Sequence, residues 1–127
     1  MSTLNVSNIT DGTTTVDTSY VVNGSAKAWV NYNISTVQDS LNVSSLTDNA
    51  QGDHTANFSN SFSSANHVPT TGGRFDSSFH GLVSVGDRAA GSVDLFGMTG
   101  GSTATYLGSS YKSDIALVAA AVHGDLA

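Results

Sequence analysis

The sequence predicts an all-β fold, an antiparallel β-sandwich of the jelly-roll-like kind with a short N-terminal arm. β-branched and aromatic residues alternate with polar residues along several segments, which is the pattern of half-buried strands. Turn-forming pairs such as Asp11-Gly12 and Asn23-Gly24 separate these segments. All ten acidic residues are Asp, so a good helix former is missing and the acid that favours turns is retained. A chain of 127 residues is long enough for one core and one domain.

The N-terminal residues 1–25 are expected to form the arm and the first strands, and residues 26–127 the sandwich. Leu4, Val6 and Ile9 lie near strand spacing. The β-branched content of Thr13 to Val22 predicts a second strand. Asn23-Gly24 then predicts a hairpin turn, because both residues tolerate positive φ.

The segment from Ala26 to Phe58 predicts the centre of the sheet. Ala28, Val30 and Tyr32 alternate with Trp29, which places Trp29 on the opposite face of one strand. A further strand is expected over Val37 to Leu46. The turn at Asp48 to Asp53 then returns the chain through Ala56 to Phe62.

The C-terminal half predicts an irregular loop followed by four more strands. Residues 63–78 contain Pro69 and Gly72-Gly73 among Ser, Thr and Asn, which favours loop backbone. The strands are expected in FHGLVSVGDR, SVDLFGM, ATYLGSSY and IALVAAAVHG. The ALVAAAV run favours a strand over a helix, because it is short and Gly124 ends it, and its alanines would let a neighbouring subunit approach closely.

Four aromatic residues, Trp29, Tyr32, Phe58 and Phe62, are expected in the core. They alternate along strands with other apolar positions, which favours packing over the alternative of stacking on a sugar ring. Tyr106 and Tyr111 lie in polar surroundings instead and are better candidates for a surface that contacts a ligand.

Charge and composition exclude several partners. The formal net charge is −6, and four lysines and arginines cannot attract a phosphate backbone, so nucleic acid is not expected. The longest apolar run, Ile115 to Val122, is far below the roughly 18 residues of a membrane span, and no membrane insertion is expected. The N-terminus has no signal-peptide pattern, which predicts synthesis in a cytoplasm without classical export. With no cysteine, stability must come from packing or assembly.

No catalytic, cofactor or metal site is predicted. His54, His67, His80 and His123 lack the spacing of a ligand motif, so isolated histidines are favoured over the alternative that His123 meets its copies on a three-fold axis. The segment Asp48 to Asp53 lacks the EF-hand spacing and favours an ordinary hairpin turn over a calcium site. There is no G-x-S-x-G elbow. A non-enzymatic protein is therefore expected.

The phrases AKAWVNY, NVSSLTDN, GDHTANF and the terminal HGDLA resemble a family of small structural proteins of tailed bacteriophages, labelled tail-fibre or virion proteins and common in marine phages. The similarity covers Ala26 to Phe62 closely and the C-terminus weakly. It implies a non-enzymatic virion component, a homotrimer assembled in the host cytoplasm and displayed outside the particle. It supplies no catalytic residues.

Two locations in the virion remain open under this resemblance. One is a tail-fibre or short-spike protein that contacts the host surface, a host glycan included, and the alternative is a capsid decoration, cement or head-fibre protein bound to the capsid lattice. In both cases the arm would dock on another virion protein through Leu4, Val6 and Ile9. The residues expected to contact the host are Pro69, Arg74, Phe75, Tyr106 and Tyr111.

Overall fold

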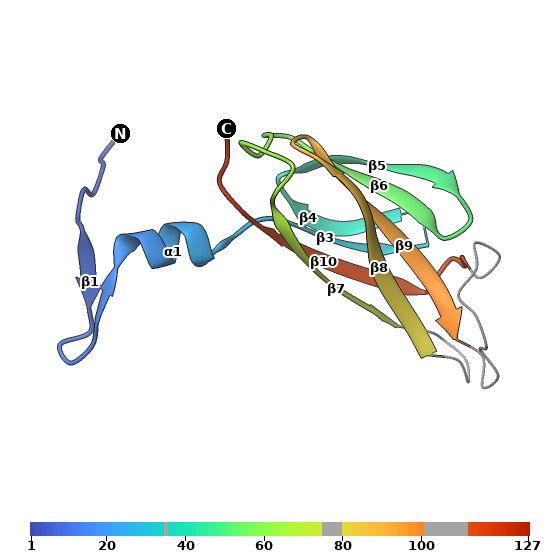
Figure 1. Cartoon of the computed structure of the whole chain (residues 1–127), viewed down its shortest axis with the longest axis horizontal. Coiled ribbons are helices and arrows are strands. Elements are labelled where there is room, and N and C mark those ends of the chain that lie inside the picture. The colour runs from blue at the N-terminus through green and yellow to red at the C-terminus, as the bar shows by residue number, and fades with distance from the viewer. Residues whose placement is uncertain (35, 75–79, 101–111) are drawn as a thin grey trace.

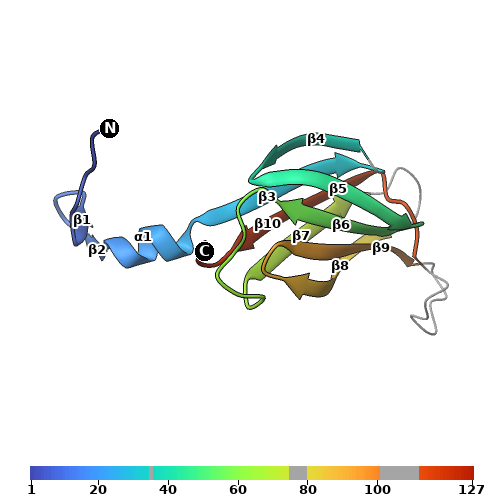
Figure 2. The same cartoon turned by 90° about the horizontal axis from the view of Figure 1, so that it is seen from above.

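A β-sandwich with a projecting N-terminal arm is the architecture of the computed structural model, which describes residues 1–34, 36–74, 80–100 and 112–127 (Figure 1). The described residues contain eight sandwich strands: β3 (Ala26–Asn33), β4 (Thr36–Leu41), β5 (Val43–Ala50), β6 (Asp53–Phe58), β7 (Val68–Arg74), β8 (His80–Ala89), β9 (Ser92–Gly100) and β10 (Leu117–His123). They form two four-stranded antiparallel sheets in the orders β4-β3-β10-β7 and β5-β6-β9-β8, which pack face to face (Figure 2). The predicted all-β sandwich is confirmed.

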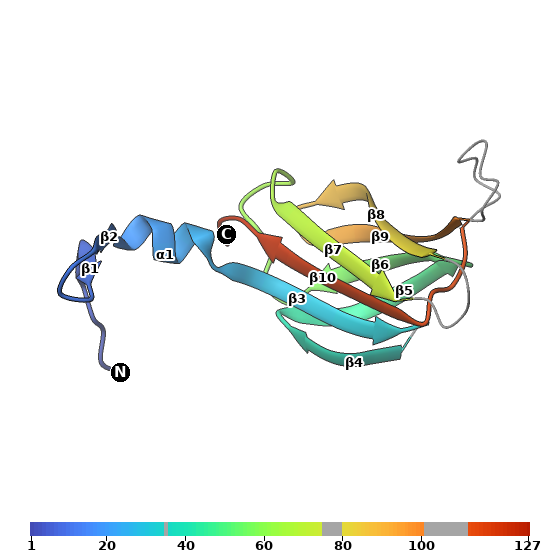
Figure 3. The ribbon, with the colours of Figure 1, turned by 90° about the horizontal axis from the view of Figure 1, so that it is seen from below.

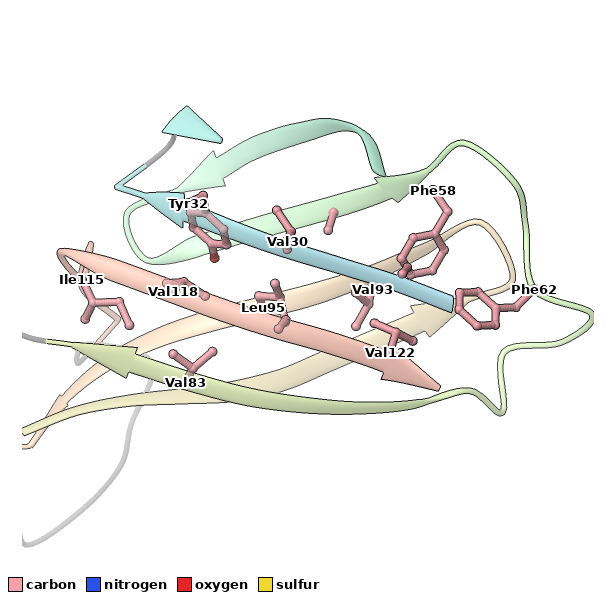
Figure 4. Close-up of a cluster of buried hydrophobic side chains, with 13 residues drawn as sticks. Val30, Tyr32, Phe58, Phe62, Val83, Val93, Leu95, Ile115, Val118 and Val122 are labelled. Carbon is pink, nitrogen blue, oxygen red and sulfur yellow. The ribbon is translucent and has the colours of Figure 1, made fainter. Parts of the chain in front are cut away.

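The core lies between the two sheets and is built from alternate residues of the central strands (Figure 4). On β3, Ala28, Val30 and Tyr32 are buried, as their alternation predicts. They face Val93 and Leu95 of β9 from the opposite sheet. The central strands, β3 and β10 in one sheet and β6 and β9 in the other, therefore supply most of the apolar interior.

Asn42 divides the expected strand Val37 to Leu46 into β4 and β5, which belong to different sheets. Its φ is 55°, a conformation that asparagine tolerates better than most residues, and its Oδ1 accepts a hydrogen bond of 2.7 Å from the Asn60 amide. The chain crosses between the sheets at this corner. The following hairpin of β5 and β6 is confirmed, and Gly52 in its turn has a φ of 65°.

The arm differs from the predicted pair of strands and hairpin turn. Strand β1 (Asn8–Thr10) pairs with β2 (Thr15–Asp17), and helix α1 (Thr18–Gly24) follows where a strand was expected. Asp17 begins the helix, because its Oδ1 accepts a hydrogen bond of 2.7 Å from the Ser19 amide. The expected Asn23-Gly24 turn is wrong, since these residues end α1 and the chain continues into β3.

The prediction of an irregular loop over residues 63–78 is wrong for Val68–Arg74, which forms β7 and pairs with β10. Pro69 is tolerated because β7 is an edge strand. Proline has no backbone N–H to donate, and one side of an edge strand forms no hydrogen bonds with a neighbouring strand. Gly73 is required for packing rather than for a turn. A Cβ at Gly73 would lie 2.6 Å from Val83 Cγ2 and 2.7 Å from Ile115 Cδ1.

The apolar ALVAAAV run forms a strand, as predicted. Strand β10 lies between β3 and β7, and Val118, Ala120 and Val122 point into the core. The strands predicted in FHGLVSVGDR and SVDLFGM correspond to β8 and β9. The strand expected in ATYLGSSY lies outside the described residues.

Candidate interaction surfaces

The arm carries an apolar groove between its hairpin and its helix, which we call the arm groove. The three residues predicted for docking, Leu4, Val6 and Ile9, line it together with Val21 and Val22 of α1, and its volume is about 410 Å³. Leu4 is 84% exposed and Val22 57% exposed. The structure thus brings the three predicted residues together in one groove. Val21 and Val22, which were expected in a strand over Thr13 to Val22, also line this groove.

Nothing within the described chain covers the arm. None of the residues of β1, β2 or α1 is buried, and the arm extends away from the end of the sandwich (Figure 1). Asp17, Thr18 and Ser19 form the helix-start signal that would have identified α1 from the sequence.

The joint between arm and sandwich is held by hydrogen bonds to the last carbonyls of α1. Lys27 Nζ donates to the carbonyl oxygen of Val22, which lies in the last turn of α1 and has no intrahelical partner, and to that of Ser25, which follows the helix. His123 Nδ1 lies 3.1 Å from the Gly24 carbonyl oxygen. The first strand of the sandwich and its last strand therefore both fix the direction in which the arm leaves.

The residues predicted for host contact lie in part outside the described chain. Pro69 and Arg74 are on β7, at one edge of the sandwich and away from the arm groove. Phe75, Tyr106 and Tyr111 are outside the described residues. The structure therefore places the first two on a regular edge strand instead of the expected loop.

Three of the four aromatic residues expected in the core are buried, and Trp29 is not. Phe58 and Phe62 pack edge to face with ring centroids 4.9 Å apart, and Tyr32 is fully buried. Trp29 lies on the outer face of the sheet and is partly exposed. The alternation along β3 predicted that Trp29 and Val30 lie on opposite faces of the strand, and this prediction is confirmed, whereas the expectation that Trp29 is in the core is wrong.

The outer face of the β5-β6-β9-β8 sheet carries a network of polar side chains, which we call the polar face. Asn57 Nδ2 lies 3.1 Å from Ser45 Oγ and 3.0 Å from Thr47 Oγ1. Thr55 Oγ1 donates to Asp94 Oδ1 at 2.6 Å. These groups satisfy one another, as side chains on a water-facing sheet can.

One ion pair extends this network at the edge of the β5–β6 turn. Lys112 Nζ lies 2.6 Å from Asp53 Oδ2 and 3.8 Å from the centroid of the Phe96 ring. Burial raises the pKa of the Asp53 carboxyl, but hydrogen bonds from Lys112 and Asn49 and the charge of Lys112 outweigh it and hold that pKa below its ordinary value. Asp53 therefore stays ionised in the folded protein at neutral pH.

We call the outer face of the β4-β3-β10-β7 sheet the β3 face, and Figure 3 shows the ribbon from the side of this sheet. Leu41, Trp29, Ala121 and Thr70 occupy one row across its four strands. The next row holds Asp39, Asn31, Ala119 and Gly72. A groove of about 350 Å³ lies beside Trp29 over the alanines, and all of its lining residues are uncharged.

The histidines His54, His67 and His123 come from different segments of the fold. His54 and His67 are buried in the sandwich, and His123 is at the joint with the arm. Among the described residues no group of three potential ligands could hold a metal ion. His67 Nε2 lies 3.0 Å from the Ala89 carbonyl oxygen, which gives this histidine a structural contact.

Within the described part of the chain, no helix has the length and apolar character needed to cross a membrane. A comparison of the sequence with protein-family models gives no match, and comparisons with curated proteins and with solved structures give none either.

Proposed function

We propose that the protein is a non-enzymatic structural component of a tailed-bacteriophage particle, a homotrimeric tail-fibre or short-spike protein that contacts the host surface. The resemblance of AKAWVNY, NVSSLTDN and GDHTANF to such proteins supports the proposal. The observation that carries it is the arm, which presents apolar side chains and has no core of its own.

An arm of this size needs a partner to be stable. A seven-residue helix is well below the roughly 12 residues at which isolated helices become even marginal in water. A two-stranded hairpin of three-residue strands is marginal as well. Burial of Leu4, Val6, Ile9, Val21 and Val22 against another protein would provide the missing stabilisation, at about 25 cal/mol per Å² of apolar surface.

The two parts of the chain then have separate roles. The arm docks on a virion protein through the arm groove, and the sandwich is displayed outside the particle and associates with its copies. Assembly also supplies stability to a chain without disulfides.

Capsid decoration is the second candidate, as a cement or head-fibre protein. The observation that favours it is that the described residues form one sandwich and one short arm, with no long shaft among them. Immunogold labelling of particles with antiserum against this protein separates the two, because a tail-fibre protein labels the tail and a decoration protein labels the head.

Substitutions in the arm groove test the docking role. Val6→Asp and Val21→Asp each place a charge in the groove, and we expect both to reduce the copies per purified particle, measured by quantitative immunoblot, at least tenfold. Tyr20→Asp is the matched control, because Tyr20 is on the same helix, is 74% exposed and does not line the groove. Unchanged particle loading of the two groove variants would exclude the arm groove as the docking site.

Contact with the host surface has its own test. A glycan array probed with the purified oligomer is expected to show binding if the protein is a tail-fibre component. A null array, together with label on the head, would favour the decoration protein.

A further inference from the structure

The Asn23-Gly24 pair does not form the turn that the sequence suggested, and it lies instead at the end of α1, where the arm meets the sandwich. Both residues are exposed. This is also the one place in the chain where glycine follows asparagine. The pair is therefore of interest for its covalent chemistry rather than for its backbone shape.

Neither the backbone nor the packing requires glycine at residue 24. The φ of Gly24 lies outside the left-handed region, and a Cβ there would meet no atom within 4 Å. Gly52 and Gly73 differ, because a Cβ at either position would collide with neighbouring atoms. The effect that glycine does have at residue 24 is on its own amide nitrogen, which no side chain shields.

The side-chain amide of Asn23 is not engaged by the fold. It makes no hydrogen bond to another described residue. Asn42, Asn49 and Asn60, by contrast, each use the side-chain amide in a hydrogen bond. Asn23 also borders a hollow of about 310 Å³ at the joint, so its side chain has room to rotate.

Asparagine is thermally labile, and one that precedes glycine forms a five-membered ring with its own backbone most readily. In this reaction the Gly24 nitrogen attacks Asn23 Cγ, a C–N bond forms there, and the Cγ–Nδ2 bond breaks. The departing amide takes the proton of the Gly24 nitrogen and leaves as ammonia. Water then opens the succinimide at either of its two carbonyl carbons, which gives aspartate or isoaspartate.

A regular helix opposes this reaction, but the free arm does not hold its helix firmly. In an α-helix the Gly24 amide is directed toward the preceding turn and away from the Asn23 side chain. However, α1 has seven residues, none of them buried, and helices of this length are unstable on their own. Lys27 and His123 hold carbonyl oxygens at this end of α1, but they do not hold the Gly24 nitrogen. Fraying of the last turn therefore releases that nitrogen.

We propose that Asn23 is a site of spontaneous deamidation in the free protein, and that docking of the arm suppresses the reaction by holding α1 closed. The first part depends on the chain alone. The second part rests on the docking role of the proposed function. Val21 and Val22 line the arm groove and directly precede Asn23 on the same helix, so a partner seated on them fixes the backbone that must open.

The product of the reaction changes the joint. Aspartate or isoaspartate places a negative charge in the last turn of α1, where the helix dipole disfavours it. Asp125 lines the same hollow and adds to the repulsion. Isoaspartate also lengthens the backbone by one methylene group between α1 and β3. A chain that reacts before it docks therefore presents its arm less well, and the age of the free protein limits its assembly.

Peptide mapping of the purified full chain by mass spectrometry tests the site. After incubation in mildly alkaline buffer, we expect Asn23 to react faster than every other asparagine and to give both aspartate and isoaspartate. Gly24→Ala is expected to slow the reaction by about tenfold or more, because the methyl group shields the nitrogen and favours the helix, and the fold has room for it. Asn60, which precedes Ser61, is the internal control and should react equally in both proteins.

The same chain unfolded in urea gives the rate at Asn23 without any helix. We expect the folded free chain to react within about tenfold of that rate, since the last turn of α1 opens at little cost. Asn23→Gln keeps the amide on a longer side chain that cyclises far more slowly, and it should give no product at residue 23 in either state. A folded chain that is slower than this, or faster reaction at another asparagine, would overturn the first part.

Docking is tested by the same mapping of purified phage particles. We expect Asn23 to react about tenfold or more slowly in particles than in the free chain, because a closed helix must first open. Asn60 should react equally in both. Equal rates at Asn23 would overturn the protective effect of docking.

Asn23→Asp carries the charge of the product and is expected to load fewer copies per particle in a quantitative immunoblot. Asn66→Asp is the matched control, because it places the same charge at the same hollow but outside α1. Equal loading of the two variants would contradict the effect of the product on assembly.

This inference and the proposed function fail separately. If the chain is absent from purified particles, the proposed function fails and the protection by docking fails with it. The comparison of folded and unfolded free chain then decides the deamidation site by itself. If the chain is present in particles and Asn23 reacts there as in the free chain, the proposed function stands and the suppression by docking is wrong.

Discussion

Tyr32 and His54 meet inside the sandwich with their ring centroids 5.2 Å apart, one from each sheet. The described residues supply no hydrogen-bond partner for the Tyr32 hydroxyl or for His54 Nε2, and Asp48 Oδ1 is 3.9 Å from that nitrogen. An unsatisfied buried polar group costs about 1–3 kcal/mol. Burial and the charge of Asp114 both raise the pKa of Tyr32 well above its ordinary value, so the hydroxyl stays neutral.

Tyr32→Phe is expected to raise the free energy of unfolding by about 1 kcal/mol, because it removes the unpaired hydroxyl and keeps the ring. Urea unfolding followed by circular dichroism measures the change. Tyr20→Phe is the control at a 74% exposed position, where we expect a change within about 0.5 kcal/mol. A destabilised Tyr32→Phe protein would show that the hydroxyl has a partner in solution.

Leu95→Ala is expected to lower the free energy of unfolding by about 2–5 kcal/mol, because Leu95 is 0% exposed at the centre of the core. Leu82→Ala removes the same atoms at a position that is 53% exposed, and should cost much less. Guanidinium unfolding of the two variants side by side gives the comparison. Equal losses would contradict the core described above.

Gly73→Ala should destabilise the protein by about 1–3 kcal/mol, because the added methyl group collides with Val83 and Ile115. Gly72→Ala is the neighbouring control, since a Cβ there meets nothing within 4 Å. The difference in thermal unfolding midpoint tests whether β7 approaches the core as closely as described. If both variants unfold at the same temperature, the close approach does not exist in solution.

Acid should weaken the fold through Asp53. Its pKa is lowered in the folded state, so its contribution is present above the unfolded pKa of about 3.9 and is lost as pH falls through the folded pKa. Asp53→Asn is expected to flatten the loss of stability between about pH 5 and pH 2. Asp87→Asn, at an exposed position of β8, should leave the pH dependence of urea unfolding unchanged.

Side-chain alternation predicted the central strands because each has one face in the core. Ala28, Val30 and Tyr32 are buried and Trp29 is not, as a period of two requires. The same signal identified β10 despite its three consecutive alanines. For strands such as β3 and β10, which have a neighbouring strand on each side, the alternation in the sequence matches the burial in the structure.

The wrong predictions were made where residue type alone indicated a loop or a strand, because residue type does not report how a segment packs. Pro69 and Gly72-Gly73 indicate a loop by residue type. Within β7, however, the edge position of the strand explains Pro69, and crowding by Val83 explains Gly73. The β-branched residues of Thr13 to Val22 favoured a strand, but the Asp17 cap begins α1. The sequence also holds no sign that Asn42 switches sheets, because its positive φ is set by the corner.

The arm runs through Ser25 directly into β3, and β3 is hydrogen-bonded on both sides, to β4 and to β10. A pull on the arm therefore acts along the strand and loads two ladders in shear. The bonds must break together rather than one at a time, so the tether resists mechanical extraction better than an edge strand would.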